Sequence, residues 1–239
     1  MVSLARSRRS ANRSWPRRIF GWILRLVIGF FLLSILMTVI YRFVPPPITL
    51  TQLGDLAQGH SISKSWMPIS QMDPHMARAA IAAEDGNFCG HHGFDFKAME
   101  QAFQNNEKGK KLRGGSTISQ QTAKNVFLWQ GRSYLRKGLE AYFTVLIEHT
   151  WGKRRIMEVY LNVAETGIRT YGANAAAQRY FQHDASHLTP VEAARIAAIL
   201  PLPSERAAID PHGRVLRYGN RILTRIGIVQ RGGYDRCVR

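Results

Sequence analysis

The 239-residue sequence contains only two cysteines, Cys89 and Cys237, and they lie far apart in the chain. Two cysteines do not form a disulfide framework, and the absence of a C-x-x-C spacing argues against a zinc site or a dithiol redox centre. We therefore expect two unpaired thiols. A single long-range bridge stays open as the alternative, because such a bridge persists in an oxidising compartment.

Acidic residues are scarce. The chain has 16 of them against 33 basic residues, which gives a formal net charge of +17. The first 50 residues contain eight arginines and no acidic residue, which leaves +9 for the other residues. A chain with this charge suits a polyanionic partner, and the candidates are nucleic acid, anionic lipid headgroups or a phosphorylated substrate.

Charge of either sign is absent from residues 26–41, an apolar run of 16 residues. Together with the apolar residues before it, this run predicts a transmembrane anchor over residues 19–44 that crosses a bilayer once. A cleaved signal peptide is the alternative. Its apolar core would be shorter and followed by a small-residue cleavage site, whereas three prolines at 45–47 follow here.

The charges on either side of the anchor predict its orientation. Residues 1–18 contain six arginines, and Arg42 is the only basic residue just after the apolar run. By the positive-inside rule, residues 1–18 form a basic cytoplasmic tail and everything beyond the anchor is exported. Because an exported domain rarely meets DNA, we expect no nucleic-acid partner.

Beyond the anchor, the alternating pattern of strands is nearly absent and helix signals dominate. Residues 45–65 are polar and aperiodic, which predicts a connector. The following domain, residues 66–239, is predicted to be mainly α-helical, with a basic mobile loop at 105–113. Its helix-start signals are Asp73-Pro74, Thr117-x-x-Gln120 and Thr189-Pro190-Val191-Glu192.

Chemically active side chains crowd into residues 84–95, which hold three carboxylates, two histidines and three glycines. For any single carboxylate, a helix cap or contact with solvent is the ordinary explanation, whereas their density favours a general base among them. Cys89, His91 and His92 lack a second ligand cluster and the usual ligand spacing, so we expect no protein metal site.

A second block, residues 114–125, combines two glycines with a helix start. On that helix Thr117, Gln120, Gln121 and Lys124 share one face, because they lie three or four residues apart. Such a face suits hydrogen bonding to sugars and phosphates, and a glycine-rich helix N-terminus suits anions. It is not a Walker loop, because the Gly-Lys-Ser/Thr sequence is missing.

Two further blocks have an ordinary structural explanation when each is considered alone. Arg136 and Glu140 are four residues apart and fit a helix-surface ion pair, with Lys137 between them. Residues 153–162 and the small residues that follow them fit core helices.

In order and spacing, these blocks resemble the motifs of the peptidoglycan glycosyltransferase family (family 51), which occurs alone or fused to a transpeptidase in penicillin-binding proteins. E-D-x-x-F-x-x-H-x-G-F-D matches residues 84–95, and G-G-S-T-I-x-Q-Q-x-A-K-N matches 114–125. R-K-x-x-E matches 136–140, and K-x-x-I-x-E-x-Y-L-N matches 153–162. The fifth motif is met in part, since Arg169 stands where glycine is usual.

The resemblance covers residues 66–204 and implies a lysozyme-like, two-lobed glycosyltransferase of the monofunctional biosynthetic type. It implies that lipid II is polymerised into β-1,4-linked glycan with inversion, releasing undecaprenyl pyrophosphate. Glu84 matches the catalytic base and Glu140 the second essential carboxylate. Lys124 and Arg132 match residues that contact the donor pyrophosphate. We assign the other motif residues to substrate binding: Ser116, Thr117, Gln120, Gln121, Asp85, Phe88, Arg136, Lys137 and Asn162.

The resemblance also implies a divalent cation, Mg²⁺ or Mn²⁺, without a clear protein ligand motif. The expected partners are lipid II, the growing lipid-linked glycan, the bacterial inner membrane and other cell-wall synthesis or division proteins, with the catalytic domain in the periplasm. Two other functions stay open, a membrane-anchored scaffold without catalysis and a lysozyme-like lytic enzyme. The lytic enzyme is disfavoured because a neutral glycan offers Lys124 and Arg132 no phosphate.

Overall fold

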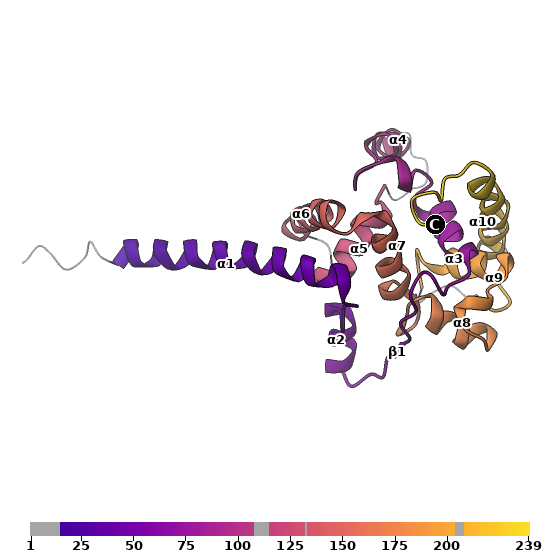
Figure 1. Ribbon diagram of the computed structural model, residues 1–239, viewed down its shortest axis with the longest axis horizontal. Coiled ribbons are helices and arrows are strands. Elements are labelled where there is room, and N and C mark those ends of the chain that lie inside the picture. The colour runs from indigo at the N-terminus through magenta and orange to yellow at the C-terminus, as the bar shows by residue number, and fades with distance from the viewer. Residues whose placement is uncertain (1–14, 108–114, 132, 204–207) are drawn as a thin grey trace, which may run out of the picture.

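The computed structural model describes residues 15–107, 115–131, 133–203 and 208–239. Helix α1 (Trp15–Phe43) projects from the rest of the protein (Figure 1). Its 29 residues correspond to roughly 43 Å, longer than the hydrocarbon core of a bilayer. Among the described residues it is the one helix long and apolar enough to cross a membrane, over residues 17–43. The helix begins before residue 19 because the arginines that precede the apolar run are good helix formers.

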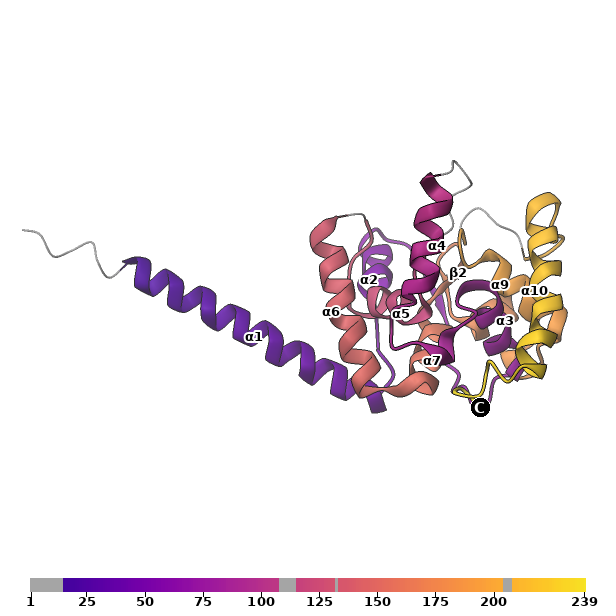
Figure 2. The ribbon, with the colours of Figure 1, turned by 90° about the horizontal axis from the view of Figure 1, so that it is seen from above.

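Beyond α1 the described chain is mainly helical, as predicted, and its main helices gather in two groups (Figure 2). The group beside α1 consists of α5 (Ile118–Phe127), α6 (Tyr134–Thr150) and α7 (Gly152–Val163). The group farther from α1 consists of α3 (Pro74–Glu84), α9 (Pro190–Ile199) and α10 (Gly213–Arg231). The remaining elements are α2 (Leu50–Ala57), β1 (Ser63–Lys64), η1 (Phe88–Gly90), α4 (Phe96–Glu107), β2 (Glu165–Gly167), β3 (Thr170–Tyr171), α8 (Ala173–Phe181) and η2 (Ala185–His187).

The predicted helix starts are confirmed. Asp73 caps α3 by accepting a hydrogen bond from the His75 amide, with Pro74 in the first turn. Thr117 opens α5 and Thr189 opens α9, each in a complete capping box. Small side chains then let α3, α9 and α10 approach closely around one continuous core, and the fully buried alanines include Ala79, Ala80, Ala193 and Ala197.

The connector expected at 45–65 contains regular structure that the sequence reading missed. Thr49 and Gln52 form a capping box that opens α2, and Gln52 is buried. β1 pairs in parallel with β3, which pairs antiparallel with β2. The strands escaped prediction because elements of two or three residues are too short to show an alternating pattern. Of the loop predicted at 105–113, residues 105–107 belong to α4 and the others lie outside the described residues.

The β2–β3 turn shows why glycine suits the position of Arg169. Arg169 has a φ of 53°, in the left-handed region that costs a side chain free energy and costs glycine little. Arg169 nevertheless adopts this conformation, and the turn forms around it. Gly172 follows with a φ of 90°, where a Cβ atom would lie 2.8 Å from the carbonyl oxygen of Asn162.

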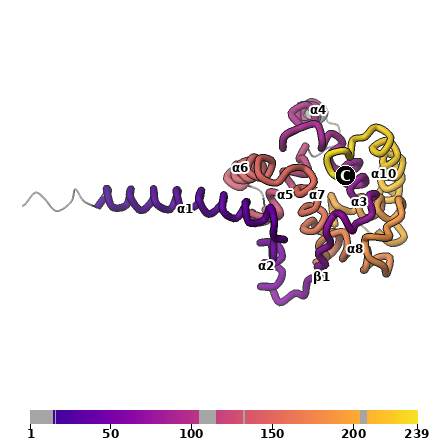
Figure 3. The backbone as a smooth tube through the Cα atoms, in the orientation of Figure 1, coloured from indigo at the N-terminus to yellow at the C-terminus, as the bar shows by residue number. Residues whose placement is uncertain are grey.

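The expectation of two unpaired thiols is wrong, because Cys89 and Cys237 form a disulfide. The C-terminal residues return to α3 (Figure 3), where Asp235 pairs with Arg78 at 2.8 Å. This return brings together two cysteines that are 148 residues apart in sequence. The distance along the chain was a poor guide because the tertiary fold, rather than local sequence, determines the pairing.

The C-terminal part of α1 and the residue just after it are joined to α6 and α7 by specific polar contacts. Ser34 and Tyr142 lie within hydrogen-bond distance at 2.6 Å, and the Trp151 indole donates to the Thr38 carbonyl at 2.6 Å. Arg155 donates to the carbonyls of Tyr41 and Val44, at 2.8 and 2.9 Å through its Nη2. The Tyr41 carbonyl is in the last turn of α1 and the Val44 carbonyl comes just after it, so Arg155 satisfies acceptors at the end of the helix. The anchor is therefore docked on the domain.

Candidate active site

The candidate active site lies where the end of α3 meets α5 and α6. Glu84 is the last residue of α3, and its carboxylate accepts a hydrogen bond of 2.9 Å from the side-chain amide of Gln121 on α5. The Gln121 carbonyl oxygen accepts one of 3.4 Å from the hydroxyl of Tyr160 on α7. Because the oxygen of Gln121 faces Tyr160, its NH₂ group is turned toward Glu84. The half-buried carboxylate thus has a fixed neighbour.

The Tyr160 hydroxyl stays protonated and can therefore donate a hydrogen bond to Gln121. Burial raises the pKa of Tyr160 well above its usual range, and the negative charge of Glu84 raises it further. The hydroxyl therefore keeps its proton at a pH where an ordinary tyrosine would lose it. No role was predicted for Tyr160, because its neighbours in sequence fit a core helix, where a tyrosine is usually explained by packing.

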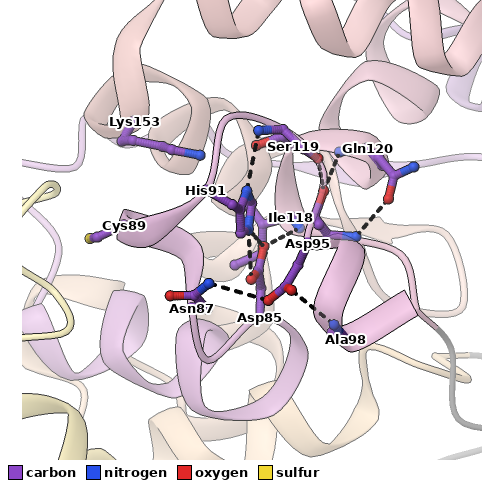
Figure 4. A network of polar contacts seen from close by, with 12 residues as sticks. Asp85, Asn87, Cys89, His91, Asp95, Ala98, Ile118, Ser119, Gln120 and Lys153 are labelled. Carbon is purple, nitrogen blue, oxygen red and sulfur yellow. Dashed lines mark hydrogen bonds and ion pairs between the residues drawn. The ribbon is translucent and has the colours of Figure 1, made fainter. Parts of the chain in front are cut away.

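Asp85 follows Glu84, but its carboxylate is buried and used within the protein (Figure 4). It accepts hydrogen bonds from His91 Nε2 at 3.0 Å and from the Ile118 amide at 2.9 Å. His91 Nδ1 accepts from the Gly93 amide at 3.2 Å, so Nε2 carries the proton of a neutral imidazole. The network ties the loop after α3 to the first turn of α5, and we assign Asp85 a positioning role.

Thr117 and Gln120, both predicted to bind substrate, are buried in the cap of α5. The Thr117 hydroxyl accepts from the Gln120 amide at 3.1 Å and donates to the Gly93 carbonyl at 2.6 Å. The Gln120 side chain accepts from the Thr117 amide at 3.0 Å. Ser116, one residue earlier, is exposed. Of these three residues, Ser116 has the surface with which to meet a ligand.

Phe88, another predicted substrate-binding residue, is fully buried. The Lys153 ammonium lies 4.5 Å from the centre of its ring, and Lys153 pairs with Glu148 at 2.6 Å. Glu148 also accepts a hydrogen bond of 2.5 Å from Ser119 on α5. This packed network joins α5, α6, α7 and η1. Glu148 was missed because nothing in its own sequence neighbourhood distinguishes it from an ordinary helical glutamate.

A cationic cluster on α5 and α6 consists of Lys124, Arg136 and Lys137. Glu140 is only 4% exposed and pairs with Arg136 at 3.0 Å and with Lys137. The Nε–H group of Arg136 is buried and has no hydrogen-bond partner among the described residues. Because a buried, unpaired donor is unfavourable, this group suits an incoming acceptor. Arg132, predicted to contact pyrophosphate, lies outside the described residues.

Lys124 on α5 connects this cluster with Glu84. Burial lowers the pKa of its ammonium, the negative charge of Glu140 opposes that effect, and the positive charge of Arg136 adds to it. Glu84 also raises the pKa of Lys124. Gln121, which contacts Glu84, and Lys124 lie one turn apart on α5, and α5 packs on α6, which carries Glu140. The fold therefore brings Glu84, Glu140 and Lys124 into a single site, with the cations in excess.

Asn162 is placed elsewhere. Its side-chain amide accepts from the Met67 amide at 2.8 Å and donates to the carbonyls of Met67 and Glu158, at 2.9 and 2.8 Å. It is also 1% exposed. Asn162 therefore fastens the chain before α3 to α7, a structural role that its position in a motif did not reveal.

In the described part of the chain, no three side chains of His, Cys, Asp or Glu come together as a metal-binding group. His91 is committed to Asp85, and Cys89 to the disulfide. Glu140 pairs with Arg136 and Lys137, and Glu84 accepts a hydrogen bond from Gln121, so a cation at this site would take most of its ligands from the substrate.

Residues 51–227 match the family model described as Transglycosylase. The chain belongs to the transglycosylase family. A transglycosylase of Caulobacter vibrioides, named a biosynthetic peptidoglycan transglycosylase, is 54% identical over 200 residues, which cover 84% of this chain and 87% of the relative. A relative of the same name from Rhodospirillum centenum is 47% identical over 211 residues, 88% of this chain and 91% of that one.

A third transglycosylase of that name, from Bdellovibrio bacteriovorus, is 46% identical over 213 residues, 86% of this chain and 84% of the relative. The matched region of the family model begins in α2 and ends within α10. It thus contains the helices of both groups apart from the end of α10, and every described residue of the candidate site.

Proposed function

We propose that this protein polymerises lipid II into β-1,4-linked glycan strands for cell-wall synthesis, by inverting transfer with release of undecaprenyl pyrophosphate. The observation that carries the proposal is a carboxylate on one side of the site, Glu84, beside a cationic cluster of Lys124, Arg136 and Lys137 on the other. One base and several cations are what this reaction requires.

The reaction assigns a role to each side of the site. The acceptor sugar hydroxyl gives its proton to Glu84 while its oxygen bonds to the anomeric carbon of the donor. The bond from that carbon to the pyrophosphate oxygen breaks, and its electron pair leaves with undecaprenyl pyrophosphate. Lys124 and Arg136 stabilise the negative charge that develops on the leaving group. A pyrophosphate is a good leaving group, so no acid has to protonate it.

The divalent cation belongs to the proposal as well. Mg²⁺ or Mn²⁺ is commonly held by one or two carboxylates together with substrate phosphates. Here Glu140 pairs with Arg136 and Lys137 and Glu84 has to accept a proton, so the oxygens of the substrate pyrophosphate would supply most of the ligands. The cation supplies charge neutralisation to the pyrophosphate when it is bound. The protein side chains hold and orient the same oxygens.

The orientation of the anchor is also proposed. Residues 1–18 contain six arginines, and Arg42 is the only basic residue just after the apolar run, which favours a cytoplasmic N-terminus and a periplasmic domain at the inner membrane. The disulfide supports an oxidising compartment. A topology reporter fused after Arg239 should be active only in the periplasm; activity in the cytoplasm would reverse the orientation.

The experiment that tests the reaction is polymerisation of labelled lipid II by the purified full chain in detergent. We expect long glycan that a muramidase digests, and no clearing of a cell-wall suspension. Clearing would favour the lytic alternative. A folded protein that makes no polymer would favour the non-catalytic scaffold, whose protein partners among cell-wall and division enzymes stay a proposal.

Tyr160→Phe should slow polymerisation about fivefold to tenfold, since a single hydrogen bond contributes about 0.5–1.5 kcal/mol. Without the hydroxyl, the Gln121 amide is free to turn its oxygen toward Glu84. The kcat for lipid II and the melting temperature are to be measured together. Tyr234→Phe, at an exposed position near the C-terminus, is the matched control. An unchanged kcat in folded Tyr160→Phe would remove Tyr160 from this role.

The lowered pKa of Lys124 predicts an alkaline limit to donor binding. Lys124 must be charged to attract pyrophosphate, and it loses its proton at a lower pH than the ordinary lysine value of 10.5. We therefore expect kcat/KM to decrease as the pH is raised, with the decrease beginning at a pH lower than 10.5. In Lys124→Arg, whose guanidinium keeps its charge, this alkaline decrease in kcat/KM should move to higher pH. Lys97→Arg, at an exposed site on α4, should leave the dependence of kcat/KM on pH unchanged. If the decrease occurs at the same pH in Lys124→Arg as in the parent, it does not come from Lys124.

A further inference from the structure

Helix α10 carries four arginines along one side, which we call the α10 arginine stripe: Arg214, Arg217, Arg221 and Arg225. Spacings of three or four residues place them on one face of the helix, and all four side chains are exposed. The helix contains no acidic residue. Among the described residues the arginines in ion pairs are Arg78, Arg136, Arg155 and Arg239, none of them in the stripe, so the charge of the stripe is available to a ligand.

The stripe runs beside the end of α3. Tyr218, on the same side of α10, donates a hydrogen bond of 2.9 Å to the carbonyl of Ala83, the residue before Glu84. Arg225 reaches the carbonyl one residue earlier, at 3.4 Å. The Arg221 guanidinium lies 5.6 Å from the centre of the Tyr218 ring. A ligand held on the stripe is therefore in reach of the candidate base.

The position of α10 argues against a lipid ligand. Both ribbon views place α10 at the end of the domain farthest from α1, the helix that spans the membrane (Figures 1 and 2). Anionic headgroups act only within about a Debye length of the membrane surface. The stripe also consists of arginines without a lysine. The planar guanidinium binds carboxylates and phosphates through two parallel hydrogen bonds, whereas an ammonium acts as a point charge, so it is the distance from the membrane that argues against lipid phosphates here.

We propose that the α10 arginine stripe binds the acidic peptides borne by the glycan strand, as a carboxylate-binding subsite distinct from the pyrophosphate site on α5 and α6. The inference rests on the proposed polymerisation of lipid II. It adds a second contact for the substrate on α10, whereas Lys124 lies on α5. A ligand with several carboxylates along its length matches a row of guanidinium groups.

The test is direct binding of soluble glycan fragments to the full chain in detergent, measured by fluorescence anisotropy without turnover. Fragments that carry their peptides should bind, and the same fragments stripped of peptides by an amidase should bind at least about tenfold more weakly, since several exposed pairs of modest energy act together. The triple variant Arg214→Gln/Arg217→Gln/Arg221→Gln should lose the same factor. Binding should also weaken as salt is raised.

Two further variants separate the explanations. Replacing the same three arginines with Lys keeps the charge and should recover only part of the affinity, because the bidentate geometry is lost. Arg154→Gln/Arg231→Gln/Arg236→Gln removes equal charge from exposed sites outside the stripe and should bind like the parent. Equal loss in this control would reduce the effect to net charge and overturn the proposal.

Two other outcomes are equally decisive. If stripped and intact fragments bind alike, or if the stripe variant instead loses binding to phosphatidylglycerol vesicles, the peptide subsite is wrong. Polymerisation of lipid II by the parent is scored in a separate assay, so failure of the proposed function is told apart from failure of the subsite. With the subsite present, the stripe variant should polymerise with a raised KM and nearly unchanged kcat.

Discussion

Glu84→Gln is expected to lower the rate of lipid II polymerisation by about 10²–10⁴-fold, the usual contribution of a general base. Glutamine keeps the size of the side chain and its place at the end of α3, but it cannot accept the proton of the attacking hydroxyl. The partner of Glu84, the Gln121 amide, can still find the remaining carbonyl oxygen. We therefore expect loss of kcat with substrate affinity and melting temperature close to those of the parent.

Glu100→Gln on α4 is the matched control, since this glutamate is exposed and its side chain accepts a hydrogen bond only from Gln104 among the described residues. It should polymerise like the parent. If Glu84→Gln retains a tenth or more of the parent rate, Glu84 is not the base. Glu140→Gln then becomes the informative variant, although it also leaves Arg136 and Lys137 without their partner, so a change in its melting temperature must be measured beside its rate.

Much of the fold was predictable because its signals are local. Proline at a helix start, a threonine three residues before a glutamine or glutamate, and an uncharged apolar run each act through neighbours in sequence. For that reason the starts of α3, α5 and α9 and the membrane helix were found. The strands and α2 were not, since their short segments form only when the chain around Asn162 and Tyr171 supports them.

The site divides in the same way. Motif order led to Glu84, Lys124 and Glu140, which the fold brings together. It did not separate residues that face a ligand from residues that hold the site in place. Asp85 and Asn162 belong to the second kind, because their hydrogen bonds go to partners 33 and 95 residues away. Contacts over such distances leave no trace in local spacing.

Reduction of the Cys89–Cys237 disulfide should destabilise the protein by about 3–5 kcal/mol. The bridge closes a segment of 148 residues, and the chain-entropy account gives about 5 kcal/mol for a loop of that length. For a domain of this size the change corresponds to a fall in melting temperature of roughly 10 °C. Melting of the full chain in detergent, with and without reductant, measures it.

The double variant Cys89→Ser/Cys237→Ser should melt near the reduced parent and should not respond to reductant. A reduced parent that melts with the oxidised one would contradict the stabilising role of the bridge. Reduction should also affect the rate of polymerisation. Cys89 lies five residues after the candidate base, in the loop that Asp85 ties to α5. At a temperature where both forms are folded, the reduced protein should bind donor normally but polymerise more slowly, since the bridge restrains the loop that follows Glu84.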